Sequence, residues 1–497
     1  MKTFVSSLFS LSLMASISYG ASAPTLDLVW PPHGHHYGAL RSSFIFGSVQ
    51  PPSARVTVNG QPLPVYKTGA FLAVVPLSPG AFSFRLQATS EGGQAELTRD
   101  VVVDPSAEPS PWRAGEFDPV NYLRKGPRRV CRMKDDLVTV TTGPDKDLGY
   151  QAFLPKGVLS AVTGSWGKFL RLGFGNQWVG WVSREVVTLL PEGTPVPHSV
   201  LGSLTVTTAA GSTLISIPLE AQQPFRVEQV LDPVRFKLFL YGVTADMDKV
   251  NYGSDVSCVK DIRWKQLDDS LCELDITTNQ RSGWGYDVRY EGTQMIFEIR
   301  HAPPLHRSLG RPLAGLVVAL DAGHSSADPG ATGPLRTHED AINLLVARQL
   351  EAKLKSMGAG VVMVRKEDEV LDLLRRTRIA WSARAHLFIS LHENSIADSG
   401  NPLEDSGFSI YYWAPQSRPL AEAVHAAYQA NIPFKDRGIS YDNLAVCRMT
   451  QMPSILTESA FLIVPEQEAM LLDPAFRDRI AGTIAQGIQQ YLKKAVP

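Results

Sequence analysis

The chain has 497 residues, of which 44% are hydrophobic and 20% are charged, and its formal net charge is −1. This composition is that of a globular protein and excludes a disordered one. The length suggests about three or four domains. The balanced charge and the lack of a long Lys/Arg run exclude a general attraction to polyanions, so we expect no nucleic-acid partner.

The first twenty residues have the form of a secretory signal peptide. Lys2 precedes an apolar stretch from Phe4 to Ile17, and small residues follow in S-Y-G-A-S-A. The apolar stretch is too short to span a membrane comfortably, and we expect cleavage after Gly20. The sequence therefore predicts a signal peptide over 1–20, an exported protein of the periplasm or cell envelope, and no integral membrane segment after cleavage.

Residues 24–105 are predicted to form a small β module. Asn59-Gly60 between two apolar runs is a strong hairpin signal. The pattern resembles an immunoglobulin-like module of bacterial surface enzymes, and a Pro-rich linker follows over 104–112. His33, His35 and His36 fall in one loop. We expect them to be solvated rather than to bind a metal.

Two further β domains are predicted. Residues 128–192 contain short strands that close with Trp178-Val-Gly-Trp-Val, and they resemble a bacterial Src-homology-3-like barrel. In cell-wall enzymes such barrels often bind wall polymer or peptide; alternatively, Trp166, Trp178 and Trp181 are core residues, as we expect for two of them. Residues 197–303 alternate apolar and polar positions, which indicates half-buried antiparallel strands. Their order resembles the AMIN module, which implies a possible envelope protein partner.

The four cysteines permit disulfides in an exported protein but do not require them. Cys258 and Cys272 are the near pair, and they lie in a predicted hairpin that turns around Asp268-Asp269. In that register Cys272 lies opposite Lys265, which disfavours a bond to Cys258. No C-x-x-C occurs, so a cysteine-rich zinc site is excluded.

Alternating strands and helices begin at about residue 314. The helix expected over 339–357 has apolar residues on one face and stops at Gly358. Further helices are expected over 371–384, 419–431 and 474–493. Strands are expected over 316–320, 361–364, 387–391, 408–413, 443–448 and 454–457. The pattern predicts an α/β domain over 312–497, with a mostly parallel sheet flanked by helices, after three small all-β modules.

Four polar residues accompany the buried strands of this domain. They are His324 in D-A-G-H, Glu339 in T-H-E-D, His392 in S-L-H-E-N and Glu458 in L-T-E-S. The carboxyl ends of parallel strands meet at one crevice, so these residues are expected to converge there. Two imidazoles and a carboxylate are a familiar ligand set for catalytic Zn²⁺, and they leave a position for water and a second carboxylate as base. Singly each residue has a structural explanation; the macrodipole of the helix, for example, accounts for Glu339. His338 is expected at the surface.

The stretch 314–497 resembles the catalytic domain of zinc-dependent N-acetylmuramoyl-L-alanine amidases of type 3. The motifs that carry the resemblance are D-A-G-H with D-P-G-A, E-D-A-I-N-L, the helix with L-x-x-R-x-x-I-A, S-L-H-E-N, R-G-I and M-P-S-I-L-T-E-S-A-F-L. The resemblance implies that His324, Glu339 and His392 bind one Zn²⁺ and that Glu458 is the catalytic carboxylate. Departures are Ser325-Ser326 for a Gly pair, Ala460 for Gly, and Glu393 for a small residue, which adds charge at the rim.

The implied reaction is hydrolysis of an amide by zinc-activated water. Zinc lowers the pKa of bound water from about 15.7 to about 7, Glu458 takes the proton and passes it to the leaving amine, and zinc holds the oxyanion. Asp321 either orients the second ring nitrogen of His324 or only ends a strand. Asn394 is a candidate for a hydrogen bond to substrate.

The leading hypothesis is a peptidoglycan hydrolase that cuts between the lactyl group of N-acetylmuramic acid and L-alanine. One alternative is a zinc peptidase that cuts within the stem peptide, and mass spectrometry of digested peptidoglycan separates the two. Another is a non-catalytic cell-wall-binding protein. The stretch 393–407 is short, polar and rich in turns, so no helix that plugs the site is expected.

Overall fold

The computed structural model describes residues 22–105, 129–146, 148–175, 178–306 and 308–496. The described residues form two compact units, the first from residues 22–105 with two short segments, 333–336 and 397–401, and the second from the other described residues. The predicted signal peptide and most of the predicted linker lie outside the described residues. None of the described helices combines the length and the apolar character that a membrane span requires.

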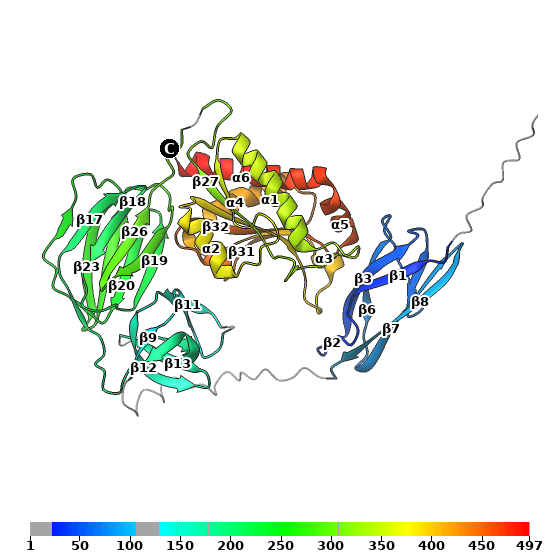
Figure 1. Cartoon of the computed structure of the whole chain (residues 1–497), viewed down its shortest axis with the longest axis horizontal. Coiled ribbons are helices and arrows are strands. Elements are labelled where there is room, and N and C mark those ends of the chain that lie inside the picture. Colours follow the sequence, from blue (N-terminus) through cyan, green and yellow to red (C-terminus); the bar gives the residue numbers. More distant parts are fainter. Residues whose placement is uncertain (1–21, 106–128, 147, 176–177, 307, 497) are drawn as a thin grey trace, which may run out of the picture. The chain divides into compact units, whose positions relative to one another are not determined.

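The N-terminal module is built from two sheets around one apolar core (Figure 1). Asn59 and Gly60 both have positive φ, as a tight hairpin turn requires, and the predicted hairpin is confirmed. One sheet has the order β1-β3-β6 and the other β2-β8-β7-β4-β5. The strands are β1 (Thr25–Trp30), β2 (His36–Tyr37), β3 (Ser42–Gln50), β4 (Arg55–Val58), β5 (Gln61–Leu63), β6 (Ala70–Pro76), β7 (Gly80–Ser90) and β8 (Gly93–Val103).

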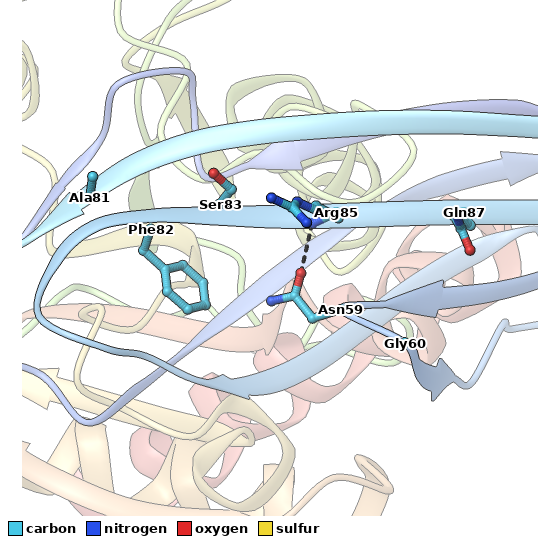
Figure 2. A pocket seen from close by; sticks show the side chains of 7 residues that line it. All are labelled: Asn59, Gly60, Ala81, Phe82, Ser83, Arg85 and Gln87. Carbon is cyan, nitrogen blue, oxygen red and sulfur yellow. Dashed lines mark hydrogen bonds between the residues drawn. The ribbon is translucent and has the colours of Figure 1, made fainter.

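A hollow of about 550 Å³ lies on this module beside the β4–β5 hairpin. Figure 2 shows the Asn59 side chain beside Arg85, whose backbone N–H donates to Asn59 Oδ1 at 2.8 Å. The residues that line the hollow include none of those predicted for metal binding or catalysis. The hollow therefore contributes no chemistry to the predicted reaction.

The second β domain is one antiparallel sheet with the order β11-β10-β14-β13-β12-β9-β15. Trp181 is buried, Trp178 is half-buried against the core, and Trp166 is 43% exposed, as expected for two core tryptophans of the three. The strands are β9 (Arg129–Met133), β10 (Val138–Thr141), β11 (Tyr150–Leu154), β12 (Leu159–Trp166), β13 (Phe169–Phe174), β14 (Trp178–Ser183) and β15 (Val187–Leu189), with a 3-10 helix η2 (Arg184–Val186).

The third β domain contains sheets β22-β17-β18-β26-β25 and β19-β20-β24-β23 and the pair β16-β21 around a shared core. All four cysteines of the chain are free and buried. Cys272 lies opposite Gln266 rather than Lys265, because a register shift between Gln266 and Asp268 moves the pairing by one residue. The strands are β16 (Ser199–Leu201), β17 (Leu204–Ala209), β18 (Ser212–Ile217), β19 (Phe225–Leu231), β20 (Val234–Tyr241), β21 (Val243–Ala245), β22 (Val250–Tyr252), β23 (Val259–Asp268), β24 (Leu271–Thr278), β25 (Tyr286–Glu291) and β26 (Gln294–Arg300).

The C-terminal domain is a three-layer α/β structure (Figure 1). Its sheet has the order β28-β27-β29-β32-β30-β31; the first four strands are parallel, and β30 runs antiparallel to β32. The strands are β27 (Val317–Ala322), β28 (Gly360–Met363), β29 (Leu387–Asn394), β30 (Phe408–Tyr412), β31 (Asp436–Tyr441) and β32 (Ser454–Phe461). This arrangement confirms the predicted mostly parallel sheet.

Helices cover both faces of this sheet. One face packs against α1 (Glu339–Ser356), α4 (Arg418–Asn431) and α6 (Pro474–Ala495), and the other against α2 (Leu373–Ser382) and the 3-10 helix η4 (Ala445–Arg448). The shorter helices are α3 (Pro402–Asp405), η3 (Pro415–Ser417) and α5 (Pro465–Leu472). The strand predicted over 443–448 is wrong: η4 forms there and packs its buried Val446 and Cys447 beneath the sheet.

The domains of the second unit share apolar contacts. Phe239 and Tyr241 of the third β domain belong to the core of the second. Trp284 is 3% exposed and packs into the core of the C-terminal domain, with its ring 5.5 Å from that of Tyr491. Arg300 donates from Nη2 to the carbonyl oxygens of Arg384 and Ala385. The C-terminal domain thus depends on residues that precede it in the chain.

Candidate metal centre

Two histidines and a glutamate meet where the parallel strands end. His324 lies two residues after β27, Glu339 opens α1, and His392 lies near the end of β29. One potential ligand atom from each lies within 4.8 Å of the others. The loop, the helix start and the strand are far apart in sequence, so the parallel sheet topology brings the three residues together.

Glu339 holds the centre of this group. Its Oε1 lies 2.9 Å from His392 Nδ1 and 3.4 Å from His324 Nε2, and its Oε2 accepts from the Ala331 N–H at 2.8 Å. Burial would raise the pKa of Glu339, but the bond and charge of His392 and the charge of His324 lower it overall. Burial would lower the pKa of His392, but Glu339 raises it overall. A buried carboxylate placed between two imidazoles favours positive charge, as a divalent metal site requires.

Backbone geometry limits which residues fit around this group. His324 has a φ of 62°, in the left-handed region. A Cβ on Gly323 would lie 2.2 Å from the His392 ring, and a Cβ on Gly330 would lie 2.3 Å from Glu339 Oε2. The two glycines therefore allow the ligand side chains to approach each other across the loop.

Two buried arginines hold the loop that carries His324. Arg376 of α2 donates to Asp321 Oδ1 at 2.7 Å, to the Ala322 carbonyl at 2.9 Å and to the His324 carbonyl at 2.8 Å. Arg365 donates to the carbonyls of Ala322 and Gly323, each at 3.1 Å. These bonds satisfy carbonyl groups that leave the strand ladder and fix the unusual backbone of His324.

Asp321 has a different position from the one predicted as an orienter of the His324 ring. Its Oδ1 binds Arg376 and its Oδ2 accepts from Ser390 Oγ at 2.8 Å. The carboxylate nearest to His324 Nδ1 is Asp328, at 3.7 Å. Asp321 is 0% exposed, and Arg376 on α2 is the cation that compensates its charge. Its link to His324 therefore runs through Arg376 to the backbone and not through the imidazole.

Glu458 lies on β32 directly opposite His392 in the sheet register. Its Oε2 is buried and forms no hydrogen bond with the protein. Burial raises the pKa of Glu458 to about 8, with His392 opposing and Glu339 adding to that rise. Unsatisfied buried carboxyl oxygens are rare outside functional sites. The atom is available to a group that occupies the space between Glu458 and the three-residue cluster.

The prediction that Glu393 adds charge at the rim of the site is wrong. It is 3% exposed, and its charge acts on the buried Tyr428 of α4. Burial and the charges of Glu458 and Glu339 raise the pKa of Glu393 well above its ordinary value. The side chain therefore adds a buried, readily protonated carboxyl beneath the site.

The remaining predicted residues lie outside the cluster of His324, Glu339 and His392. Asn394 ends β29 and is partly exposed. His338 precedes α1 and is exposed, as expected. In the described part of the chain, His33, His35 and His36 belong to no cluster of metal-ligating side chains, whereas Glu339 does. Arg365, Arg376 and Asn343, whose Nδ2 donates to Glu339 Oε1 at 3.2 Å, were missed. The R of the L-x-x-R motif was the available signal for Arg376.

The donor set fits zinc. Imidazole nitrogen and carboxylate oxygen are its usual ligands, and three protein ligands are the usual number at a catalytic zinc site. The unpartnered Oε2 of Glu458 opposite the cluster is consistent with a nearby water or substrate group. The arrangement can therefore hold one divalent ion and a carboxylate base.

Residues 318–490 match the Amidase_3 family model, described as N-acetylmuramoyl-L-alanine amidase. The chain is 31% identical over 185 residues to N-acetylmuramoyl-L-alanine amidase LytC of Bacillus subtilis, covering 37% of each protein. It is 33% identical over 180 residues to the uncharacterized protein YqiI of Bacillus subtilis, covering 36% of this chain and 86% of YqiI. The match to LytC thus spans little more than a third of that protein.

Among solved structures, the catalytic domain of CwlV, an N-acetylmuramoyl-L-alanine amidase from Bacillus (Paenibacillus) polymyxa var. colistinus, is 36% identical with a TM-score of 0.34. The match covers 36% of this chain and 98% of that domain. AmiC2 of Nostoc punctiforme, also an N-acetylmuramoyl-L-alanine amidase, is 32% identical with a TM-score of 0.34, over 36% of this chain and 97% of that one.

Proposed function

The chain belongs to the Amidase_3 family of N-acetylmuramoyl-L-alanine amidases, and from that premise we propose that it is a peptidoglycan hydrolase. The bond cut is the amide between the lactyl group of N-acetylmuramic acid and L-alanine. The observation that carries the proposal is the cluster of His324, Glu339 and His392 opposite the unpartnered Glu458. No comparable observation favours cleavage within the stem peptide.

His324, Glu339 and His392 would hold one Zn²⁺. When bound, the ion would supply Lewis-acid polarisation of the scissile carbonyl and make the attacking water more acidic. Glu339 keeps the two imidazoles in place through Oε1, while Ala331 and Asn343 fix its carboxylate from behind. Such supporting bonds orient ligands and raise affinity.

Glu458 would act as the general base and then as the general acid. Its free Oε2 takes a proton from the attacking water and returns it to the nitrogen of the leaving L-alanine. Burial raises the pKa of this carboxyl to about 8 in the metal-free protein, and the charge of a bound dication would lower it from there, so the group is suited both to take and to return a proton near neutral pH. Asn394, at the end of β29, is a candidate donor to the substrate.

The three β domains would place the enzyme on the wall. We assign an immunoglobulin-like module to 24–105, a Src-homology-3-like domain to 128–192 and an AMIN-like domain to 197–303, ahead of the catalytic domain at 312–497. The two-sheet and seven-stranded arrangements support these assignments. Peptidoglycan would be the ligand, an envelope protein could bind the AMIN-like domain, and the signal-like 1–20 would direct export to the periplasm or envelope.

The site would be open without an activator. Between β29 and β30 the described helix is the four-residue α3, too short to form an independently stable plug. A comparison of the fragment 306–497 with the full chain, on soluble muropeptide, would address this. That fragment lacks Trp284 and Arg300, so its folding must be checked first.

The decisive experiment is digestion of purified peptidoglycan by the full chain, followed by mass spectrometry. Amidase action releases intact stem peptides and leaves glycan strands without peptides. Shortened stem peptides still attached to muramic acid would instead indicate a peptidase. The same protein is assayed for zinc, where His392→Ala should lose most of the metal. A fully metallated His392→Ala protein would overturn the ligand assignment.

A further inference from the structure

A groove of about 600 Å³ lies where the second and third β domains meet helix α2 and the loop that precedes β32. Thr450 and Gln451 precede β32, and Trp413 follows β30, which runs antiparallel to β32. The groove therefore borders the amino ends of the parallel strands. The candidate metal centre lies at their carboxyl ends, so the groove is a separate site.

Direct contacts between the three domains hold this groove. Gln451 Nε2 donates to Asp287 Oδ1 at 3.0 Å, and the Tyr286 N–H donates to the Thr450 carbonyl at 2.7 Å. The guanidinium of Arg448 lies 4.2 Å from the centre of the Tyr150 ring. Such contacts keep the groove preformed, as ligand sites usually are.

Six aromatic side chains line the groove, and one of them, Trp381, is 37% exposed. They are Tyr150, Phe153, Phe225, Tyr286, Trp381 and Trp413. Rings of this kind offer broad apolar faces at low entropic cost, and they suit a ligand that presents flat apolar faces of its own. The pyranose rings of a glycan have such faces.

The groove also presents an uncompensated positive charge. Arg226, Arg289 and Arg378 each pair with a carboxylate, Glu228, Glu298 and Asp136 respectively. Arg448 donates to Asn443 and lies against Tyr150, and no carboxylate in the described part of the chain forms an ion pair with it. A guanidinium in a groove is the preferred partner of a ligand carboxylate.

Two buried acceptors in the groove form no hydrogen bond with the protein. Asp287 is 5% exposed, and its Oδ2 lies 3.7 Å from Arg289 Nη1, an ion pair that is longer than a hydrogen bond. Gln151 Oε1 is also buried and has no hydrogen-bond partner in the protein. Buried acceptors normally find a donor. Ligand hydroxyl or amide N–H groups would supply one for each. A ligand that fits this groove would therefore combine flat apolar faces, hydrogen-bond donors and a carboxylate.

We propose that this groove binds a peptide-free glycan strand of peptidoglycan, with a lactyl carboxylate at Arg448 and sugar hydroxyl or acetamido N–H groups at Asp287 and Gln151. The inference rests on the proposed function. Hydrolysis adds water across the lactyl C–N bond, so the carboxylate stays on the glycan and the amine leaves with L-alanine. The enzyme would thus bind the product strand of its own reaction. Helix α2 connects the two sites, because it lines the groove and its Arg376 donates to the His324 carbonyl beside the metal centre.

The test is equilibrium binding of the full chain to purified peptide-free glycan strands with free lactyl carboxylates. The same strands with carboxylates converted to primary amides, and free stem peptide, are the comparison ligands. Arg448→Gln should weaken binding to the carboxylate strands by about 10-fold or more, the loss of one charged hydrogen bond, and leave binding to the amidated strands unchanged. Arg448→Lys should restore part of the loss.

Trp381→Ala should weaken binding to both strand types, because it removes stacking and not charge. Trp264→Ala is the matched control, since Trp264 is 38% exposed but does not line the groove, and it should bind as the unsubstituted chain does. Amidase activity on soluble muropeptide checks the fold of each variant and separately tests the proposed function. Equal binding of carboxylate and amidated strands, or groove-dependent binding of stem peptide in preference to glycan, would overturn the inference.

Discussion

Replacement of Arg376 by Met should destabilise the loop that carries His324. The Arg376 side chain is 5% exposed and the side chain of its partner Asp321 is 1% exposed, so the substitution leaves a buried carboxylate without its cation. Breaking a buried pair in this way costs about 3–5 kcal/mol. The carbonyls of Ala322 and His324 lose donors as well, which removes the bonds that fix the left-handed backbone of His324.

The consequence can be measured in the full chain by hydrogen–deuterium exchange of β27 and β29, whose opening free energy should fall by several kcal/mol. A chelator competition should show a zinc affinity lowered by about 10- to 100-fold, as for other residues that support metal ligands. Arg378→Ala is the control on the same helix. Its side chain is 48% exposed and pairs with an exposed Asp136, so the loss should stay below about 1 kcal/mol.

A double variant tests whether the unpaired charge of Asp321 causes the loss of stability. In the double variant Asp321→Asn with Arg376→Met, no buried charge is left unpaired, so its loss of stability should be smaller than that of Arg376→Met alone. If the Arg376→Met variant has the same hydrogen–deuterium exchange rates and the same zinc affinity as the unsubstituted protein, Arg376 does not stabilise the loop that carries His324.

Glu458→Gln should keep zinc but lose nearly all turnover, because the amide cannot accept the proton; retention of most activity would place the base elsewhere. Trp284→Ala should destabilise the C-terminal domain by about 3–5 kcal/mol, since it empties a site packed against Tyr491; unchanged thermal unfolding would contradict this. Burial and the charges of Arg300 and Arg384 lower the pKa of His386 to about 4, and its Nδ1 accepts from the Val317 N–H. The unfolded chain takes up this proton below about pH 6.5, so stability should fall between pH 6.5 and pH 4 by at most about 3 kcal/mol. His386→Asn, which keeps an acceptor, should flatten that part of the stability profile measured by denaturant titration.

The amino-acid sequence alone determined most of the long helices and buried strands of the catalytic domain and the identity of its principal candidate ligands, but not β31, α5 or η4. Helix α1 was predictable because its apolar residues recur at helical spacing and Gly358 follows as a stop signal. His324, Glu339 and His392 were predictable because strand ends in a parallel sheet converge, and the structure brings them within reach of one ion.

Only the tertiary structure decided how those residues are supported. Asp321 meets Arg376 across 55 positions of sequence, and periodicity carries no information about which buried charge pairs with which. Residues 445–448 have strand-like composition but form η4, because a packing site beneath the sheet favours a turn that buries Val446 and Cys447. Glu393 looked like a surface charge, yet it is 3% exposed, because helices cover both faces of the sheet that contains β29. The Asp321–Arg376 pair, the turn at η4 and the burial of Glu393 all depend on contacts that form only when distant segments of the chain pack together.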